Sequence, residues 1–516
     1  MSSPTTDHRV VVIGGGVGGL SAAADLARQG LDVTLLERAP MVGGKLRQVS
    51  AGGHGVDAGP TVFTMRWVFE GLFGDSGARL EDELGLEPVQ VLARHAWGSG
   101  GRLDLFADPQ RSAEAIGAFA GPAEARRYLA FCAQTREVYS ALEGPYIRSQ
   151  RPTLPSMMAD LGIRGSKALF GLGLFSDLWA SLAKHFHDPR LQQLFGRYAT
   201  YCGSSPFDAP ATLMLVAHVE TQGVWTVRGG MVEVGRALAR LAERNGAILR
   251  TGAHVEAIEM RRGRVCGVRL ADGETLPADS VVFNGDCQAL ARGLLGPGVQ
   301  PAVDPIEPQQ RSLSAMTWCM HAHTRGFPLV HHNVFFDDDY RSEFRDIFGH
   351  GQLPRKATVY LCAQDRHDDD APLPAGERLL ALVNAPAMGD RRDLDPEEIE
   401  RCHANALGLM HRCGLELDCD PSRSVLTGPQ GFEALFPATG GALYGAACHG
   451  WMASFKRPAA WTRIPGLYLA GGSAHPGPGV PMATLSGRLA AVTLMAHLGS
   501  TSRSARVHIS GGMSMH

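Results

Sequence analysis

Short runs of apolar residues stand near both ends of the chain, and each is followed by a cluster of glycines. Residues 10–13 are Val-Val-Val-Ile, a continuous apolar run typical of a parallel strand that is buried on both faces. Residues 21–28 are rich in alanine and predict a helix. Residues 33–36 predict a second buried strand, which ends at Glu37. This strand–helix–strand order predicts an α/β fold with a parallel sheet.

The loop after the first predicted strand has the glycine spacing of a dinucleotide-binding turn. Gly14, Gly16 and Gly19 follow the G-x-G-x-x-G pattern, with Gly18 between them. In this pattern, backbone approaches a pyrophosphate closely, and the N-terminus of the following helix binds the phosphates. Glu37 lies roughly 20 residues further on, where a carboxylate accepts hydrogen bonds from ribose hydroxyls. The ordered combination predicts a Rossmann-type nucleotide-binding unit.

Apolar periodicity predicts the other elements, and region 311–445 is β-rich. Helices are predicted at residues 122–139, 211–219, 234–245, 396–413 and 482–498. Strands are predicted at residues 247–250, 255–260, 265–270, 278–283 and 467–470. Gly499 is expected to end the last helix. The apolar run 169–179 has two interpretations, a buried core helix or a segment at a membrane interface or substrate entrance.

Composition narrows the classes of function. At 516 residues the chain is expected to form two or three domains. A net charge of −3 with 20% charged residues gives no basic excess, so we expect no nucleic-acid partner. The 10 cysteines include no C-x-x-C pair, which favours reduced thiols in the cytoplasm. No apolar run reaches the roughly 18 residues of a membrane span, so a soluble or membrane-surface protein is expected.

Several histidines cluster in the β-rich region, but they do not predict a metal site. They alternate on a predicted strand and have no carboxylate at ligand spacing. We therefore predict that the chain holds no metal. The residues concerned are His321, His323, His331 and His332.

Two further glycine-rich turns and the C-terminal segment carry a family resemblance. Residues 41–45 (Met-Val-Gly-Gly-Lys) and the tight turn at 55–60 succeed the first unit, as in flavoprotein amine oxidases and phytoene-type desaturases. The stretch 475–487 most closely resembles the hydroxyneurosporene and methoxyneurosporene desaturases, the 1-hydroxycarotenoid 3,4-desaturases. Pro478 departs from the small residue that is usual there. The resemblance covers the chain to about Leu498.

The resemblance implies a discontinuous Rossmann-type FAD-binding domain, of the glutathione-reductase and amine-oxidase kind, with an inserted mixed α+β substrate domain. The FAD-binding parts are expected at 1–75, 221–298 and 451–499. The other parts are a helical substrate or membrane-associated region at 76–220, a β-rich substrate domain at 299–450 and a disordered tail at 500–516.

The resemblance and the motifs together give a set of expected FAD-binding residues. The helix that follows Pro481 would direct its positive end toward the flavin ring and favour negative charge on the reduced ring. The expected residues are Gly14, Gly16, Gly18, Gly19, Glu37, Arg38, Gly43, Gly44, Lys45, Gly59, Pro60, Val255, Asn284, Gly471, Gly472, Gly479, Val480, Pro481 and Met482.

The implied activity is FAD-dependent oxidation of a carbon–carbon single bond to a double bond in an acyclic carotenoid, a 1-hydroxy- or 1-methoxy-neurosporene or lycopene type. A carotenoid resides in membrane, so peripheral attachment to the cytoplasmic face is expected. Oxygen or a quinone would take up the electrons, and the oligomeric state stays open. Alternatives are a phytoene desaturase, another flavoprotein oxidase of this fold, and a non-catalytic isoprenoid-binding escort protein.

The sequence contains no recognisable nucleophile–base pair or paired carboxylates, so the catalytic candidate is a single residue. His475 is the titratable residue nearest the expected ring. Two interpretations stay open: His475 orients flavin or substrate, or it is a structural histidine of the loop.

Overall fold

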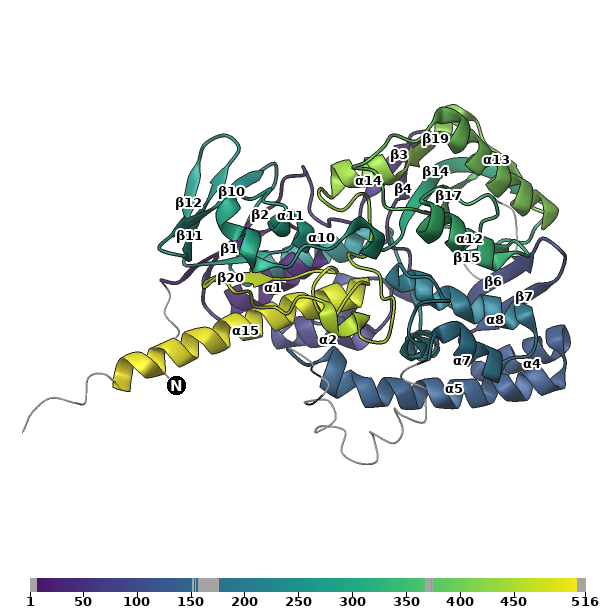
Figure 1. Cartoon of the computed structure of the whole chain (residues 1–516), viewed down its shortest axis with the longest axis horizontal. Helices are drawn as coiled ribbons and strands as arrows, with labels where there is room; N and C mark the ends of the chain where they lie inside the picture. The colour runs from purple at the N-terminus through teal and green to yellow at the C-terminus, as the bar shows by residue number, and fades with distance from the viewer. Residues whose placement is uncertain are drawn as a thin grey trace, which may run out of the picture.

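The computed structural model describes residues 7–150, 153, 155, 176–366, 373 and 375–507. Figure 1 shows two lobes side by side. One contains β1, α1 and the long helix α15 (Val480–Val507), and the other contains a large sheet and the helix α13 (Pro396–Arg412). The helix α5 (Pro122–Leu142) runs along the edge of the second lobe. None of the helices within the described ranges has the length and apolar composition needed to span a bilayer.

A parallel five-stranded sheet forms the centre of the first lobe, in the order β20-β13-β1-β2-β9. Its strands are β1 (Arg9–Ile13), β2 (Asp32–Leu36), β9 (Ile248–Arg250), β13 (Ser280–Phe283) and β20 (Leu467–Leu469). The neighbours pair in parallel. Segments 1–75, 221–298 and 451–499 therefore each contribute strands to one sheet. The boundaries of the six expected parts stay a prediction.

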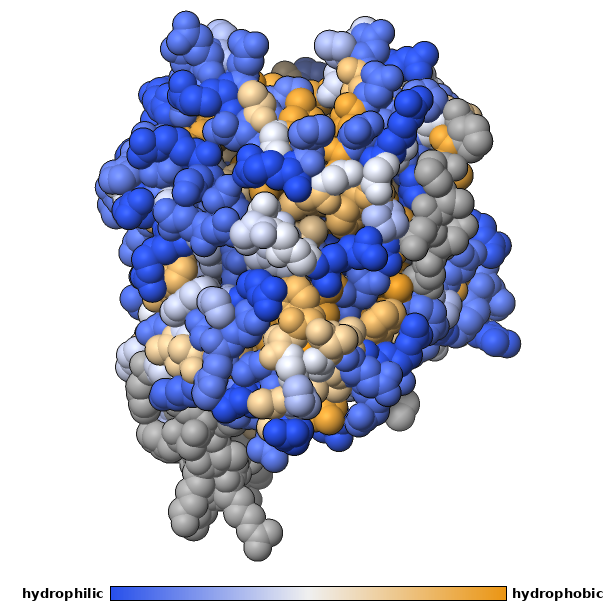
Figure 2. All heavy atoms as spheres, turned by 90° about the vertical axis from the view of Figure 1, so that its right-hand side faces the viewer, coloured by the Kyte–Doolittle hydropathy of each residue, from blue (hydrophilic) through white to orange (hydrophobic). Residues whose placement is uncertain are grey.

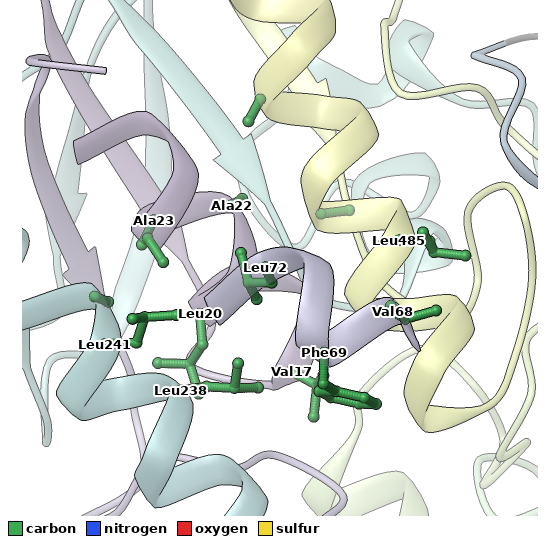
Figure 3. Packing of buried hydrophobic residues seen from close by; sticks show 14 of the residues in the cluster. Val17, Leu20, Ala22, Ala23, Val68, Phe69, Leu72, Leu238, Leu241 and Leu485 are labelled. Atoms are coloured by element: carbon green, nitrogen blue, oxygen red, sulfur yellow. The ribbon is translucent and has the colours of Figure 1, made fainter. Parts of the chain in front are cut away.

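Helices cover this sheet through a continuous apolar core. Figure 3 shows side chains of α1 (Val17–Arg28), α2 (Arg66–Asp75), α10 (Val232–Arg244) and α15 packed together. Leu20, Leu72 and Leu238 belong to this cluster and are fully buried. Burial of each such leucine contributes about 1.5–3 kcal/mol to folding. A second, small antiparallel sheet consists of β10 (Val255–Arg261), β11 (Arg264–Leu270) and β12 (Thr275–Pro277).

The second lobe is built on a mixed sheet in the order β18-β14-β17-β16-β15-β6-β7, with β19 also pairing with β14. Its strands are β6 (Val91–Trp97), β7 (Arg102–Phe106), β14 (Ser314–Arg325), β15 (His332–Phe336), β16 (Val359–Ala363), β17 (Glu377–Ala385), β18 (Glu416–Asp418) and β19 (Ser424–Thr427). Figure 1 shows α4 (Pro109–Ala120), α5, α7 (Leu178–His185) and α8 (Pro189–Gly196) beside the sheet. The short elements η2 (Arg197–Cys202) and α9 (Leu215–Thr221) follow α8 in the chain.

Three expectations from the sequence need correction. Region 76–220 is not only helical, because β6 and β7 lie in it, and β6 finds its parallel partner in β15, far away in sequence. The turn expected at 55–60 is partly strand, since β4 (His54–Asp57) pairs with β3 (Gln48–Ala51).

The third correction concerns the C-terminus. The last helix does not end at Gly499 but continues to Val507, into the expected disordered tail. A glycine inside a helix costs only about 1 kcal/mol and does not by itself end it. Residues 508–516 lie outside the described chain, as do residues 169–175 of the apolar run 169–179.

Candidate functional site

A cavity of about 900 Å³ connects the two lobes. One part is lined by the loops that follow β1, β2, β13 and β20, at the carboxyl ends of the parallel strands. Ligands of open α/β sheets bind at this edge. The other part is lined by η2 and α9 on one side and by β14, β16 and β17 on the other.

The first glycine loop brings three distant segments into contact. Asn284, at the end of β13, donates from Nδ2 to the carbonyl oxygen of Gly14 at 3.0 Å. A Cβ added at Gly18 would lie 2.7 Å from Asn284 Oδ1 and 2.9 Å from the Gly471 nitrogen. At Gly19, an added Cβ would lie 2.1 Å from the Gly14 carbonyl oxygen. Only glycine fits at these positions, which keeps α1 close to the strands.

The carboxylate of Glu37 is fixed at the end of β2. One oxygen accepts a hydrogen bond from the Gly15 N–H at 2.7 Å, and the other accepts from the Ala39 N–H at 2.8 Å. Its side chain is buried and lines the cavity. A carboxylate oxygen can accept more than one hydrogen bond. The two backbone contacts therefore orient Glu37 and leave it able to accept hydrogen bonds from ribose hydroxyls.

The second glycine turn closes over the first. The Gly43 N–H donates to the Gly15 carbonyl oxygen at 2.8 Å. Lys45 is turned away from the first loop: its ammonium donates to the carbonyl oxygen of Leu443 and lies 5.1 Å from the centre of the Phe436 ring. Burial lowers the pKa of Lys45. The expected role of Lys45 in binding FAD stays a prediction.

The start of α15 and the loop before it form another wall of the cavity. Ser486, on α15, accepts a hydrogen bond from the Gly471 N–H at 3.2 Å. The N-terminal turn of α15, which includes Pro481, faces the cavity. Its positive dipole end therefore faces the space where a flavin ring would be bound.

Nearly all the expected cofactor residues border one continuous space. Gly19 packs behind the loop and does not line it. The expected residues that line the cavity are Gly14, Gly16, Gly18, Glu37, Arg38, Gly43, Gly44, Lys45, Gly59, Pro60, Val255, Asn284, Gly471, Gly472, Gly479, Val480, Pro481 and Met482. The glycine cradle, the oriented acid and the helix N-terminus fit an elongated dinucleotide such as FAD.

Arg457 and Asp286 are among the charged residues of the cavity wall that are absent from the expected set. Arg457 donates to the carbonyl oxygens of Tyr444 at 3.1 Å, Gly472 at 3.2 Å and Ala446 at 3.0 Å. It thereby joins the second lobe to the loop after β20. Asp286 lies two residues after Asn284, and burial raises its pKa. The turn at 284–286 was a usable signal for Asp286, whereas nothing local marks Arg457.

His475 is not among the residues that line the cavity. Its imidazole Nε2–H donates to the carbonyl oxygen of Ser149 at 2.9 Å, and its ring packs edge-on against Tyr146 at 5.1 Å. Burial lowers the pKa of His475 to about 4, so the ring is neutral near pH 7. These contacts favour the structural interpretation of His475 over the catalytic one.

One group of candidate metal ligands does come together in the described chain. The ligand atoms of His331, His332 and Cys362 lie within 4.8 Å of one another. Hydrogen bonds occupy part of the group, because His331 Nδ1–H donates to the Arg366 carbonyl oxygen and Nε2 lies 3.6 Å from Cys362 Sγ. Burial raises the pKa of the Cys362 thiol to about 12, which disfavours the thiolate that metals bind. Absence of a metal stays a prediction.

The wall of the second part of the cavity is largely apolar. Such a surface favours an apolar ligand and excludes water. Its apolar residues include Val62, Leu213, Val216, Val219, Leu380 and Leu382.

One protein family and several curated relatives match almost the whole chain. The family described as flavin containing amine oxidoreductase matches residues 17–495. A protein of Rubrivivax gelatinosus named hydroxyneurosporene desaturase is 62% identical over 100% of this chain and 98% of its own. A protein of the same name from Cereibacter sphaeroides is 47% identical, covering 96% and 99%. A 4,4'-diapolycopene oxygenase of Methylomonas sp is 31% identical, covering 95% and 99%.

Solved structures share the fold at low sequence identity. A putrescine oxidase variant has a TM-score of 0.59 at 15% identity, covering 95% of this chain and 99% of that one. An oxidoreductase from Methanosarcina mazei has a TM-score of 0.58 at 17% identity, covering 95% and 100%. At these identities the likeness concerns the fold alone.

Proposed function

The chain belongs to the family of flavin-containing amine oxidoreductases, and from this premise we propose that it desaturates a hydroxylated acyclic carotenoid. The expected FAD-binding fold and the cofactor FAD are thereby confirmed. The proposal is supported most by one observation: a single cavity runs from the dinucleotide loops into a channel with apolar walls. A long hydrocarbon chain beside a flavin is the ligand that such a cavity suits.

FAD supplies an acceptor for the hydride that leaves one carbon of the substrate, while the neighbouring carbon loses a proton. The protein's residues have a supporting role. Gly14, Gly16 and Gly18 provide a backbone cradle for phosphates, and Glu37 provides an oriented acceptor for ribose hydroxyls. The N-terminus of α15 favours negative charge near the ring.

Positioning and exclusion of water are the main requirements of this reaction. A polyene delocalises developing positive charge, so the site needs alignment more than it needs a strong base. The apolar walls contributed by α9 and β17 keep water from the reacting carbons. This account requires no histidine at the reacting bond, in agreement with the position of His475.

The direct test supplies three pigments separately to cells that express this chain and no other carotenoid enzyme. These are neurosporene, 1-hydroxyneurosporene and phytoene. We expect a longer conjugated chromophore from the hydroxylated pigment. Conversion of phytoene would identify a phytoene desaturase instead. Bound pigment with no conversion would favour an escort protein, and no pigment binding would contradict the proposal.

We also propose that the protein attaches reversibly to the cytoplasmic face of the membrane, where its substrate is dissolved. Leu294, Leu435 and Trp451 are exposed and also line the cavity, so at each of them an apolar part of the cavity wall reaches the surface. The face seen in Figure 2 carries several apolar patches, which hydrophilic residues separate.

We further propose that oxygen or a quinone takes the electrons from reduced FAD. Measuring oxygen uptake with an oxygen electrode, with and without added quinone, distinguishes the two acceptors.

A further inference from the structure

A group of polar residues stands in the channel part of the cavity, where a pure hydrocarbon would need none. We call Arg197, Tyr201, Glu220 and Tyr360 the polar cluster. All four line the cavity. They come from η2, α9 and β16, so the cluster combines two regions that lie far apart in the sequence. Each is accessible only in part.

Arg197 is held in place by aromatic residues. Its Nη1 donates to the Tyr201 hydroxyl at 2.9 Å, and its guanidinium lies 5.1 Å from the centre of the Tyr201 ring and 5.2 Å from that of Tyr360. Cation–π contacts stabilise a cation in a desolvated place. A guanidinium has five N–H donors, and these contacts use one of them. Arg197 is therefore able to donate to a ligand in the channel.

Glu220 supplies the acceptor of the cluster. The Tyr198 hydroxyl donates to its Oε2 at 2.6 Å. Burial raises the pKa of Glu220, and hydrogen bonds from Tyr198 and Tyr201 together with the positive charge of Arg197 act in the opposite direction. A carboxyl group in this desolvated place gains from any further hydrogen bond that a ligand donates.

Tyr360 ties the cluster to the sheet. Its hydroxyl lies 2.7 Å from Thr61 Oγ1 and 2.8 Å from His332 Nδ1. The Nε2 atom of the fully buried His332 has no hydrogen-bond partner in the described structure. Through Thr61 and His332, Tyr360 is held in a fixed position on the wall of the channel.

The polar cluster also adjoins the cofactor part of the cavity. Tyr444 packs against the end of the segment that carries Arg197, because a Cβ added at Gly203, directly after η2, would lie 2.5 Å from the Tyr444 ring atom Cδ2. Tyr444 lines the cavity, and its neighbour Leu443 accepts the hydrogen bond of Lys45. A ligand group held by the cluster would therefore lie near the reacting end of the channel.

We infer that the polar cluster binds the hydroxyl group of the substrate's end group and positions the bond to be oxidised. This rests on the proposed function. A tertiary hydroxyl both accepts and donates: it accepts from Arg197 and donates to Glu220. In a 1-hydroxycarotenoid, the 3,4 bond is two carbons from the hydroxylated carbon, so an anchored hydroxyl restricts the reacting carbons. An unhydroxylated chain leaves the polar cluster unsatisfied and binds less well.

The test compares 1-hydroxyneurosporene with neurosporene on purified holoenzyme in lipid vesicles. Neurosporene is measured both as an alternative substrate and as a competitive inhibitor. We expect Glu220→Gln and Tyr201→Phe each to raise KM for the hydroxylated pigment at least tenfold, while the inhibition constant of neurosporene changes less than twofold. The matched control is Tyr128→Phe, a buried tyrosine of α5 outside the cavity, which should leave both constants unchanged.

FAD per chain, measured for each variant, shows whether it has folded as the wild type does. The inference would be overturned if the variants raised the KM for 1-hydroxyneurosporene and the inhibition constant of neurosporene by the same factor, or if KM stayed unchanged in both variants. Either result would leave the proposed function standing. A wild-type enzyme that binds neurosporene as tightly as the hydroxylated pigment would overturn it as well. A wild-type enzyme that converts neither pigment would instead contradict the proposed function itself.

Discussion

At the scale of single residues, Glu37 is the most constrained group of the nucleotide site. Both of its oxygens already accept backbone N–H groups, from Gly15 and Ala39. In Glu37→Gln an NH₂ group replaces one of these oxygens. This group is a hydrogen-bond donor and would face a backbone N–H, which is also a donor, so one hydrogen bond is lost. We expect a 10- to 100-fold weaker affinity for FAD, as about 1.4 kcal/mol corresponds to each factor of ten.

Titration of the apoprotein with FAD, followed by quenching of flavin fluorescence, measures this affinity. Glu70→Gln is the control, since Glu70 lies on α2 and outside the cavity. An affinity of Glu37→Gln within twofold of the wild type would show that Glu37 does not contact the ribose.

His475 yields a prediction on pH and stability. Its pKa is about 4 in the folded protein and 6.5 ordinarily, so between these values only the unfolded chain binds the proton. The stability that this group contributes is complete above pH 6.5 and is lost as the pH falls toward 4. His475→Gln should show a smaller fall in the free energy of unfolding between pH 7 and pH 4, by up to about 3 kcal/mol.

Urea titrations at several pH values measure the difference between the two proteins. The same variant should keep carotenoid turnover within threefold of the wild type, because its imidazole does not line the cavity. Loss of turnover with normal FAD content would restore the catalytic interpretation of His475.

At the scale of elements, the contact of α1 with the sheet depends on Gly19. An added Cβ would lie 2.1 Å from the Gly14 carbonyl oxygen, which is backbone and cannot move away cheaply. We expect Gly19→Ala to destabilise the protein by about 1–3 kcal/mol, as overpacking of a well-packed core does, and to lower the FAD content. Gly74→Ala on α2 meets nothing within 4 Å and should leave stability equal or slightly higher.

Thermal unfolding followed by flavin fluorescence compares these two variants. A Gly19→Ala protein as stable as Gly74→Ala would contradict the close packing of α1 on β1. Both variants add one methyl group to a helix. A difference in their thermal stability therefore reports how tightly the chain packs around each position.

Local patterns predicted the nucleotide-binding elements well. The run at residues 10–13 is typical of a buried strand, and the glycines that follow it have the spacing of a dinucleotide-binding turn. By contrast, β6 is strand because it pairs with β15, more than 200 residues later, and no local pattern shows such a partner. Likewise, Gly499 resembles a helix end, but α15 continues past it.

The sequence predicted those parts of the site that consist of short loop motifs next to a strand. The glycine turns and Asn284 were predicted because each closely follows a strand, so the local sequence marks its position. Arg457 was missed because its role arises from three carbonyl groups of other loops. The polar cluster was missed for the same reason, since η2, α9 and β16 meet only in the folded chain.

At the scale of the whole molecule, the opening of the cavity predicts how the protein meets the membrane. Trp451 is 38% exposed and lines the cavity, whereas Trp461 is 40% exposed and does not. We expect Trp451→Glu to weaken binding to lipid vesicles at least fivefold, because a charge replaces an interfacial ring. Trp461→Glu should bind as the wild type does.

Flotation of the protein with vesicles that contain anionic lipid measures this binding. Equal weakening in both variants would point to a general effect of charge. Wild-type binding in both would place the contact with the membrane elsewhere on the surface.

In the proposed mechanism, one cavity holds FAD and a hydroxylated carotenoid so that electrons pass directly from the carotenoid to the flavin. The most direct measurement mixes holoenzyme with 1-hydroxyneurosporene in the absence of oxygen and records the visible spectrum. We predict that the flavin absorbance bleaches while the carotenoid spectrum shifts to longer wavelength, with one new double bond for each flavin reduced. A carotenoid bound without bleaching, or a new double bond formed while the flavin stays oxidised throughout, would contradict the account.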